Sequence, residues 1–270
     1  MFKKQIPSKN LPKVMGSTDI TPYWDVIKQI IRDSDILLEI LDARMPELSR
    51  NKELEETIIK NHKPFIFILN KADLISEGQL RKTYERLKKE NLCFVLSSKD
   101  HMGTKRLREW LISQAKGKEK FKVGVLGYPN TGKSSVINTI AKRKGAKVSS
   151  KAGTTHGPQW INATNNLRIV DSPGVLPIIK EDEIRYAIIG SRNAEKIKNL
   201  ELVATAIINL FEDKLPLKKF YGIETDSDDA YEIIHEIGKK KGFMKKGGQV
   251  EENRVSIQII RDWQTGKLKL

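Results

Sequence analysis

The chain has 270 residues, of which 39% are apolar, so it is long enough and hydrophobic enough to bury a sizeable core. This composition excludes a disordered chain. Lysine and arginine outnumber aspartate and glutamate by 49 to 34, which gives a net charge of +15. Residues 181–270 contain 16 residues of each sign, so the whole excess lies in residues 1–180. A polyanion, by default a nucleic acid, is the expected partner of that part of the chain.

The composition also indicates a compartment. The single cysteine, Cys93, lies in an apolar run and has no second cysteine to pair with, which favours a reducing compartment. No apolar stretch approaches the roughly 20 residues that a membrane helix needs, and the first residues lack the apolar centre of a signal peptide. We therefore expect a cytoplasmic protein that does not bind a membrane. We also expect a monomer, although the composition does not determine the oligomeric state.

Short apolar runs alternate with amphipathic segments of helical length along the first two thirds of the chain. Such runs are typical of strands buried on both faces, and their alternation with helices predicts an α/β fold with a mostly parallel sheet. A polar motif follows each run, and ligands of open parallel sheets bind beyond the carboxyl ends of the strands. One shared site is therefore expected. The runs are Ile36–Leu41, Phe65–Leu69, Leu92–Leu96, Val123–Leu126 and Leu167–Val170.

After about residue 178 apolar residues recur every three or four positions, which predicts a separate helical domain. Residues 1–22 contain three prolines and little periodicity, which predicts an extended arm. We divide the chain into an N-terminal extension at 1–22, an α/β domain at 23–178 and an all-α domain at 179–270. The predicted helices of the last domain are Asp182–Ser191, Ala194–Phe211, Asp228–Lys241 and Arg254–Thr265.

Residues 127–134 have the sequence GYPNTGKS, which fits the phosphate-binding pattern G-x-x-x-x-G-K-S between a strand and a helix. In such a loop backbone N–H groups surround the phosphates, the lysine reaches the β and γ oxygens, and the serine hydroxyl ligates magnesium. We assign these roles to Lys133, which also counts as catalytic, and to Ser134. The predicted phosphate-binding residues are Asn130, Thr131, Gly132, Lys133, Ser134 and Ser135.

The segment Asp171-Ser-Pro-Gly174 follows the last apolar run. Its carboxylate is of the kind that holds magnesium, usually through water, and the Gly174 N–H can meet the γ-phosphate. A threonine of the preceding loop, residues 151–156, completes the metal shell; Thr155 is favoured over Thr154. Thr155 and Gly174 are therefore assigned to nucleotide binding and to catalysis. The predicted magnesium ligands are Ser134, Thr155 and Asp171.

The segment Asn70-Lys71-Ala72-Asp73 fits the guanine motif N-K-x-D. The Asp73 carboxylate can accept hydrogen bonds from the ring N1–H and the exocyclic amine of guanine, whereas adenine offers no matching pair of donors. Asn70 is expected to brace the loop, and the Lys71 stem to lie along the base. The segment Ser97-Ser98-Lys99 fits the accompanying loop, in which the Ser98 N–H meets the guanine oxygen. A helix-capping turn is the alternative for residues 70–73.

All five GTPase motifs are present, but the guanine motifs precede the phosphate loop. This motif order, the segment Asp42-Ala-Arg-Met-Pro46 and residues 153–160 resemble the circularly permuted ribosome-biogenesis GTPases of the RbgA/YlqF family. Residues 221–223, 247–248 and 261–267 resemble the tail domain of that family, so the resemblance runs from about residue 25 to the end. The resemblance implies a circularly permuted Ras-like P-loop GTPase domain followed by a small all-α domain. It further implies GTP hydrolysis with GTP, GDP and magnesium, and association with the large ribosomal subunit precursor and its rRNA.

The sequence departs from the family at two points. Bacterial members carry an N-terminal histidine implicated in catalysis, whereas this chain has no histidine before His62; His156, beside the switch threonines, is an alternative. Val175 stands where Ras-like enzymes have a water-orienting glutamine, so we expect a low intrinsic rate that a partner stimulates. Asn130 resembles the asparagine by which some relatives bind potassium.

Two other functions compete with this interpretation. One is a constitutive RNA-binding protein with a structural nucleotide site, and the other is an enzyme that uses ATP. The guanine motif argues against ATP, and the intact Lys133, Ser134 and Asp171 argue against an inactive site. The basic residues 142–151 flank the predicted switch and are expected to contact rRNA, a solvated loop being the alternative. Because every motif precedes residue 175, nucleotide binding is expected to survive removal of residues 181–270.

Overall fold

The computed structural model describes residues 21–141, 159–171 and 183–270. Several sequence predictions lie outside these ranges and are not addressed by the structure. They are the extension up to residue 20, the basic cluster 142–151, Thr154, Thr155, His156, Gly174 and Val175.

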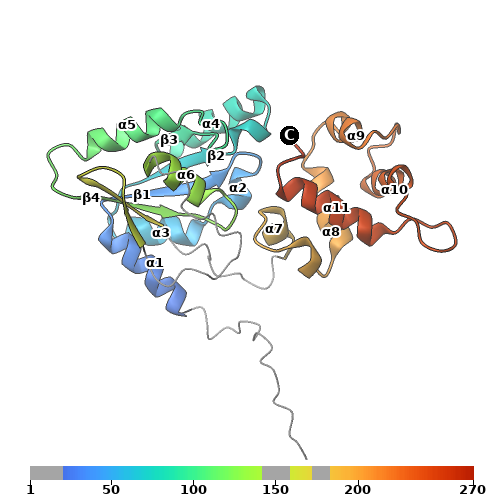
Figure 1. Cartoon of the computed structure of the whole chain (residues 1–270), viewed down its shortest axis with the longest axis horizontal. Coiled ribbons are helices and arrows are strands. Elements are labelled where there is room, and N and C mark those ends of the chain that lie inside the picture. Colours follow the sequence, from blue (N-terminus) through green and yellow to red (C-terminus); the bar gives the residue numbers. More distant parts are fainter. Residues whose placement is uncertain (1–20, 142–158, 172–182) are drawn as a thin grey trace, which may run out of the picture.

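A six-stranded sheet in the order β3-β2-β1-β4-β6-β5 forms the first unit (Figure 1). Every neighbouring pair is parallel except β5 with β6, which confirms the predicted α/β fold. The sequence did not predict β5, because its four residues, QWIN, do not form an apolar run. The strands are β1 (Ile36–Asp42), β2 (Phe65–Asn70), β3 (Cys93–Val95), β4 (Phe121–Leu126), β5 (Gln159–Asn162) and β6 (Leu167–Asp171).

Helices cover both faces of the sheet. Leu37, Leu41 and Phe67 face one side, where they lie in clusters with residues of α1, α3 and α4, while Leu38 and Ile40 face the other side with α5 and α6. Side chains of alternating strand positions are thus buried on both faces, as the continuous apolar runs indicated. These helices are α1 (Thr21–Asp33), α3 (Lys52–Lys60), α4 (Glu77–Glu90), α5 (Thr104–Gln114) and α6 (Lys133–Ala141); α2 (Pro46–Ser49) is a single turn after β1.

Residues 183–270 form the helical unit, drawn from sand to red in Figure 1. The predicted helix Ala194–Phe211 is wrong at its start, because Ile197 is extended and separates a 3-10 turn from α8. The seven-residue α9 was missed, since it is too short to show periodicity. The elements are α7 (Glu183–Ile188), η3 (Ala194–Lys196), α8 (Leu200–Asn209), α9 (Leu215–Tyr221), α10 (Ala230–Lys241) and α11 (Glu252–Gln264).

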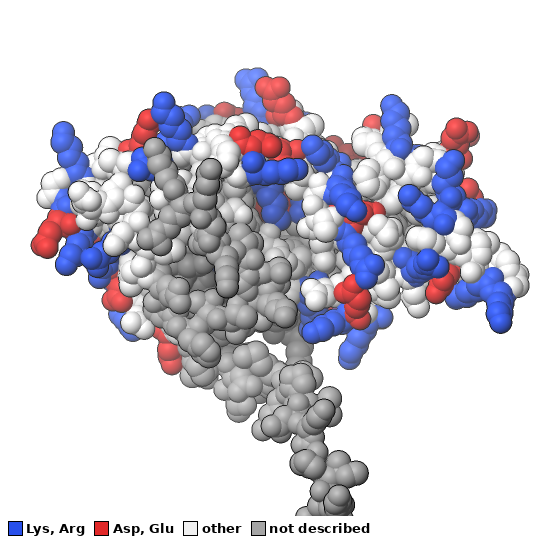
Figure 2. Space-filling view, viewed as in Figure 1, with Lys and Arg blue, Asp and Glu red and all other residues white. Residues whose placement is uncertain are grey.

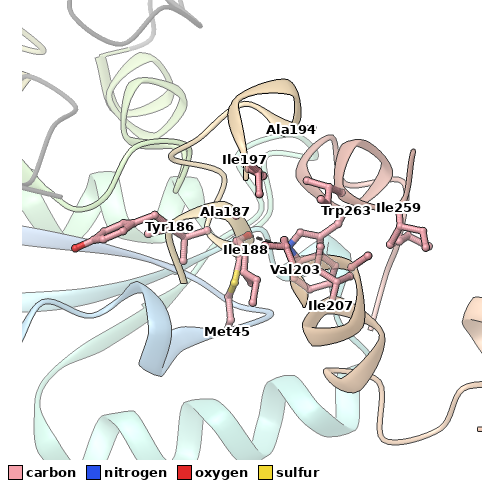
Figure 3. Packing of buried hydrophobic residues seen from close by; sticks show 14 of the residues in the cluster. Met45, Tyr186, Ala187, Ile188, Ala194, Ile197, Val203, Ile207, Ile259 and Trp263 are labelled. Atoms are coloured by element: carbon pink, nitrogen blue, oxygen red, sulfur yellow. Dashed lines mark hydrogen bonds between the residues drawn. The ribbon is translucent and has the colours of Figure 1, made fainter. Parts of the chain in front are cut away.

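The helical unit shares a hydrophobic core with the sheet unit. Met45 of the sheet unit belongs to the same buried cluster as Tyr186, Ile188 and Trp263 of the helical unit (Figure 3). Tyr128 of the sheet unit is also part of this cluster. The Tyr128 and Tyr186 rings lie 5.9 Å apart, and the Trp263 indole N–H donates to the Ile188 carbonyl at 2.8 Å. Burial of this kind is the dominant stabilising contribution in folding. Apolar packing therefore joins the two units, although the sequence pattern separates them.

None of the helices in the described parts of the chain combines the length and the apolar character needed to cross a membrane.

One carboxyl group is buried in the middle of the sheet. Glu39 of β1 is inaccessible to solvent; its Oε1 accepts the Asn51 N–H at 2.9 Å, while its Oε2 has no hydrogen-bond partner within the described ranges. Burial, and next the charge of Glu55, raises the pKa of Glu39 to about 8, against the smaller opposing effects of Asn51, Arg50 and Lys52. Glu39 is thus mostly protonated at neutral pH.

Ionisation of Glu39 is expected to destabilise the fold as the pH rises from 5 to 8. The unfolded chain, with an ordinary pKa of 4.5, gives up this proton before the folded chain does, so the free energy of unfolding falls across this window. Protonated Glu39 makes its full contribution to the free energy of unfolding only below the pKa of the unfolded chain. Between pH 5 and 8 the free energy of unfolding falls by about 3 kcal/mol through this group.

Urea unfolding of Glu39→Gln at pH 5 and pH 8 tests this expectation, because the glutamine amide cannot ionise. In Glu39→Gln the free energy of unfolding should lack the fall that Glu39 causes between pH 5 and pH 8. Glu109→Gln, a change at an exposed carboxylate of α5, should leave that fall unchanged. Equal declines in the parent and in Glu39→Gln would show that Glu39 does not titrate in this range.

Candidate functional site

The phosphate loop connects β4 to α6, and its lysine is held by the loop itself. Lys133 is 6% exposed, and its Nζ donates to the carbonyls of Gly127 and Tyr128, each at 2.8 Å. The Thr131 hydroxyl donates to the same Tyr128 carbonyl at 2.9 Å. These bonds close the loop around the ammonium group. The predicted phosphate ligand is therefore fixed in place at the start of α6.

Asn70, at the end of β2, connects the phosphate loop to the loop after β3. Its Nδ2 donates to the Thr131 carbonyl at 2.9 Å, and its Oδ1 accepts the Ser98 hydroxyl at 2.9 Å and the Ser98 N–H at 3.2 Å. Gly132 allows this approach, because a Cβ there would lie 2.2 Å from Asn70 Nδ2, and its φ is +96°. The Ser98 N–H, which is predicted to meet the guanine oxygen, here donates to Asn70, and its role toward guanine stays a prediction.

Asp73 lies next to the loop after β3, residues 97–99, which we call the second guanine loop. The buried Ser97 hydroxyl is 2.8 Å from Asp73 Oδ1 and 3.1 Å from Asp100 Oδ2. Asp73 lies in the 3-10 helix η2 (Ala72–Leu74) and is partly exposed, while Lys99 is exposed. The predicted base ligand is therefore held by Ser97 at the rim of the site, where a ligand can reach it.

Lys71 makes a contact that sequence reasoning missed. Its backbone is left-handed, with φ +62°, and its Nζ donates to Oδ2 of the buried Asp42 at 2.7 Å. Arg44 binds the same carboxylate through Nε at 3.1 Å and Nη2 at 2.9 Å. Burial alone would raise the pKa of Asp42, but the charges of Lys71 and Arg44 outweigh it and hold that pKa well below its usual range. The available signal was Asp42-Ala-Arg44 at the end of β1, since Asp42 pairs in register with Asn70.

The predicted magnesium ligands are only partly described. Ser134 lies in the first turn of α6, directly after the phosphate loop. Asp171 is the last residue of β6 and pairs with Val125 of β4, two residues before the loop begins, although the structure does not describe its side chain. Hydroxyl and carboxylate oxygens are the donors that magnesium prefers, so this donor set fits the ion. Thr155 and Gly174 lie outside the described residues.

Asn130, the predicted potassium ligand, connects the phosphate loop to the helical unit. Its backbone is left-handed, with φ +63°, and its Nδ2 donates to the carbonyl of Gly190 in the turn after α7. Because the amide nitrogen faces this carbonyl, a cation would bind the amide oxygen. The loop that is predicted to hold the phosphates is thus in direct contact with residues 183–190.

Comparison with known proteins identifies the family. The model described as RsgA GTPase matches residues 28–178, and the model described as 50S ribosome-binding GTPase matches residues 122–244. Ribosome biogenesis GTPase A of Bacillus licheniformis is 33% identical, over 86% of this chain and 87% of that protein. A GTP-binding protein of Methanocaldococcus jannaschii is 40% identical over 92% and 66% of the two chains, and Nucleolar GTP-binding protein 2 of Pneumocystis carinii is 35% identical over 91% and 52%.

The chain therefore spans between about half and two thirds of the length of these last two relatives. The crystal structure of GNP-bound YlqF from T. maritima shares the fold, with a TM-score of 0.61 and 24% identity over 92% of this chain and 95% of that one. Motif order, family models and relatives agree, and the chain belongs to the circularly permuted ribosome-biogenesis GTPases.

Proposed function

We propose that this chain binds GTP and GDP, hydrolyses GTP, and acts as a nucleotide-dependent assembly factor on the precursor of the large ribosomal subunit. The observation that carries the proposal is the pair of contacts made by Asn70. It bonds Thr131 of the phosphate loop and Ser98 of the second guanine loop, which brings the separate motifs into one site. Two relatives named Ribosome biogenesis GTPase A support the place of action.

The proposed roles follow from the positions of the residues. Lys133 binds the β and γ oxygens and stabilises charge on the transferred phosphoryl group, and Asp73 recognises the base. Ser134, Thr155 and Asp171 would hold magnesium, which supplies positive charge beside the phosphates. Val175, in place of a water-orienting glutamine, implies a low intrinsic rate that the assembling particle raises. We place this activity in the cytoplasm, in a monomer that does not bind a membrane.

An exposed basic segment of the helical unit is a candidate rRNA contact. Five lysines, at positions 239–241, 245 and 246, are exposed at the end of α10 and in the following loop, and no acidic residue occurs between Ile237 and Val250. Arg254 holds this loop by stacking on Phe243, with its Cζ 4.3 Å from the ring centre. Elsewhere on the face shown in Figure 2, lysine and arginine side chains are interspersed with acidic ones. A local cluster of this kind suits phosphate contacts.

Co-sedimentation with large-subunit particles, in a GTP analogue and in GDP at two salt concentrations, tests the proposed function. We expect tighter binding with the analogue, and a steep loss of binding with salt, because phosphate contacts release counterions. Charge reversal at Lys245 and Lys246 should reduce the salt slope by roughly one unit for each phosphate contact that is lost. Equal affinity in both nucleotides would favour the alternative of a constitutive RNA-binding protein.

Potassium is expected to stimulate hydrolysis if Asn130 holds the ion. Replacing sodium by potassium at constant ionic strength should then raise the turnover number, because a cation beside the transferred phosphate stabilises developing charge. Asn130→Ala should flatten this response. Since that variant also loses the Gly190 contact, GDP affinity is measured in parallel to separate ion binding from loop displacement. A parent chain indifferent to the two ions removes potassium from the mechanism.

A further inference from the structure

The predicted guanine-binding residues are in contact with the end of the chain. We name residues 71–76 the guanine loop and residues 263–270 the C-terminal segment. We propose that the C-terminal segment, acting through Arg44, positions the guanine loop, so that docking of the helical unit sets the affinity and the selectivity for the base. This proposal rests on the assignment of Asn70–Asp73 to guanine. Arg44 and the C-terminal segment are positioning elements, because neither is placed to touch the nucleotide.

A chain of buried charges forms the first connection. The Lys71 ammonium bonds Asp42, Asp42 bonds Arg44, and Arg44 Nη1 donates to the Trp263 carbonyl at 2.7 Å. The Arg44 Cζ also lies 4.0 Å from the centre of the Trp263 ring. Asp42 and Arg44 are 1% and 6% exposed and the Lys71 side chain is 20% exposed, so water screens these contacts only weakly. One guanidinium group thus binds both the carboxylate that holds Lys71 and the last turn of α11.

The backbone conformation of Lys71 explains why its ion pair with Asp42 matters for the position of the guanine loop. A non-glycine residue in the left-handed region is sterically disfavoured, so its surroundings must hold it there. The ion pair with Asp42 holds the Lys71 side chain, and the Leu74 N–H donates to the Lys71 carbonyl at 3.0 Å. Arg44 in turn fixes the carboxylate through two parallel N–H bonds, a geometry that lysine cannot reproduce. Replacing the Arg44 side chain would remove these two bonds and leave the Asp42 carboxylate held only by the backbone N–H of residue 44, at 3.1 Å, and by Lys71. The carboxylate, and Lys71 with it, would then be less firmly positioned.

Backbone pairing and packing form a second connection, independent of charge. The Leu270 N–H donates to the Leu74 carbonyl, and the Ser76 N–H donates to the Leu270 carbonyl, both at 2.9 Å. Gly266 packs against Leu74, where a Cβ would lie 3.0 Å from a methyl carbon of the leucine. In Figure 1 the marked C-terminal end accordingly lies between the two units of the molecule. The residues on the carboxyl side of Asp73 are thus bonded to the segment that follows α11.

The C-terminal segment is itself anchored in the helical unit. The Trp263 indole N–H donates to Ile188, as the dashed line in Figure 3 shows, and Gln264 Nε2 donates to the carbonyls of Ala187 and Arg192 at 2.8 and 2.9 Å. A partner that displaces the helical unit would therefore displace the support of the guanine loop. Because coupling between two binding events is reciprocal, a guanine nucleotide would also strengthen docking of the helical unit.

This coupling differs from the expectation that nucleotide binding survives removal of residues 181–270. That expectation followed from the position of the motifs, all of which precede residue 175. The contacts of Leu74 and Ser76 with Leu270, and of Arg44 with Trp263, join residues about 200 positions apart in the sequence. The spacing of the motifs cannot predict such contacts.

Equilibrium binding of GDP, IDP and ADP to Arg44→Ala and Arg44→Lys tests the proposal. IDP lacks the exocyclic amine that Asp73 is predicted to bind, so the ratio of GDP to IDP affinity reports the position of the guanine loop. We expect Arg44→Ala to lower GDP affinity about tenfold and to bring this ratio close to one. Arg44→Lys should restore part of the ratio, because an ammonium group still faces Asp42 but lacks the two parallel bonds.

Arg50→Ala is the matched control. Arg50 is another buried arginine of the same unit; it bonds Glu55 at 2.7 Å and lies over the Phe67 ring at 4.7 Å, without contacting the guanine loop. Its replacement should lower the thermal unfolding midpoint and leave the GDP to IDP ratio unchanged. If Arg50→Ala lowers the ratio as much as Arg44→Ala does, general destabilisation is the cause and the proposal is wrong.

If Arg44→Ala does not fold, a chain that ends at Lys267 tests the same proposal. It lacks Leu268–Leu270 and hence the two backbone bonds to the guanine loop. We expect the same loss of selectivity at a temperature where circular dichroism shows the parent helix content. The proposal is overturned if the ratio of GDP to IDP affinity stays within twofold of the parent value both in the chain ending at Lys267 and in Arg44→Lys. Failure of the guanine assignment itself is distinguishable, because the parent chain would then show no preference for GDP over IDP or ADP.

Discussion

Asp73→Asn is expected to change the preference of the site from guanine to xanthine nucleotides. The carboxylate is predicted to accept hydrogen bonds from the guanine N1–H and amine, whereas an asparagine amide would place a donor where xanthine has a carbonyl. Two bonds to a charged acceptor contribute about 1.5–3 kcal/mol each, so GDP affinity should fall by about 150-fold or more. Titration of GDP, XDP and ADP by calorimetry measures this change.

Asp100→Asn is the control for this experiment. Asp100 contacts the same Ser97 hydroxyl as Asp73, at 3.1 Å against 2.8 Å, but is not predicted to reach the base. It should keep the preference for GDP over XDP. Equal affinity of the parent chain for GDP and ADP would contradict the assignment of Asp73, and would also revive the interpretation of residues 70–73 as a capping turn.

The fold was predictable where local pattern and global packing agree. The five apolar runs became strands because both faces of the central strands are buried, as in β1, where all seven residues from Ile36 to Asp42 are buried. The edge strand β5 was not predictable, because only its inner neighbour β6 and the antiparallel register specify it. The sequence pattern did not predict the core that the two units share either, since Tyr128 and Tyr186 meet only when the chain has folded back over the sheet.

The candidate site divides in the same way. The motif residues follow strands, so their meeting at one edge of a parallel sheet follows from the fold alone, and Asn70 does lie against both the phosphate loop and Ser98. The place of Arg44 at the end of a strand was visible in the sequence, but its contact with Trp263 was not, because the two residues are 219 positions apart. The sequence therefore predicts which groups contact the nucleotide better than it predicts which groups hold them.

Lys133→Ala is expected to remove most of the affinity for GTP and GDP. The ammonium is the predicted partner of the β and γ oxygens, and loss of one member of a buried charge pair costs about 2–5 kcal/mol, or roughly 30- to 5,000-fold in affinity. The structure adds a second reason. The same group bonds the carbonyls of Gly127 and Tyr128, so alanine would also open the loop whose backbone N–H groups surround the phosphates.

Lys63→Ala separates these causes from the general effect of deleting a lysine that binds backbone carbonyls. Its Nζ donates to the carbonyls of Arg32 and Ser34 at 2.7 and 2.8 Å, at the opposite end of the sheet from the phosphate loop. This variant should lose stability but bind GDP as the parent does. Fluorescence titration with a labelled GDP measures both variants, and an unchanged affinity in Lys133→Ala would mean that residues 127–134 do not hold the phosphates.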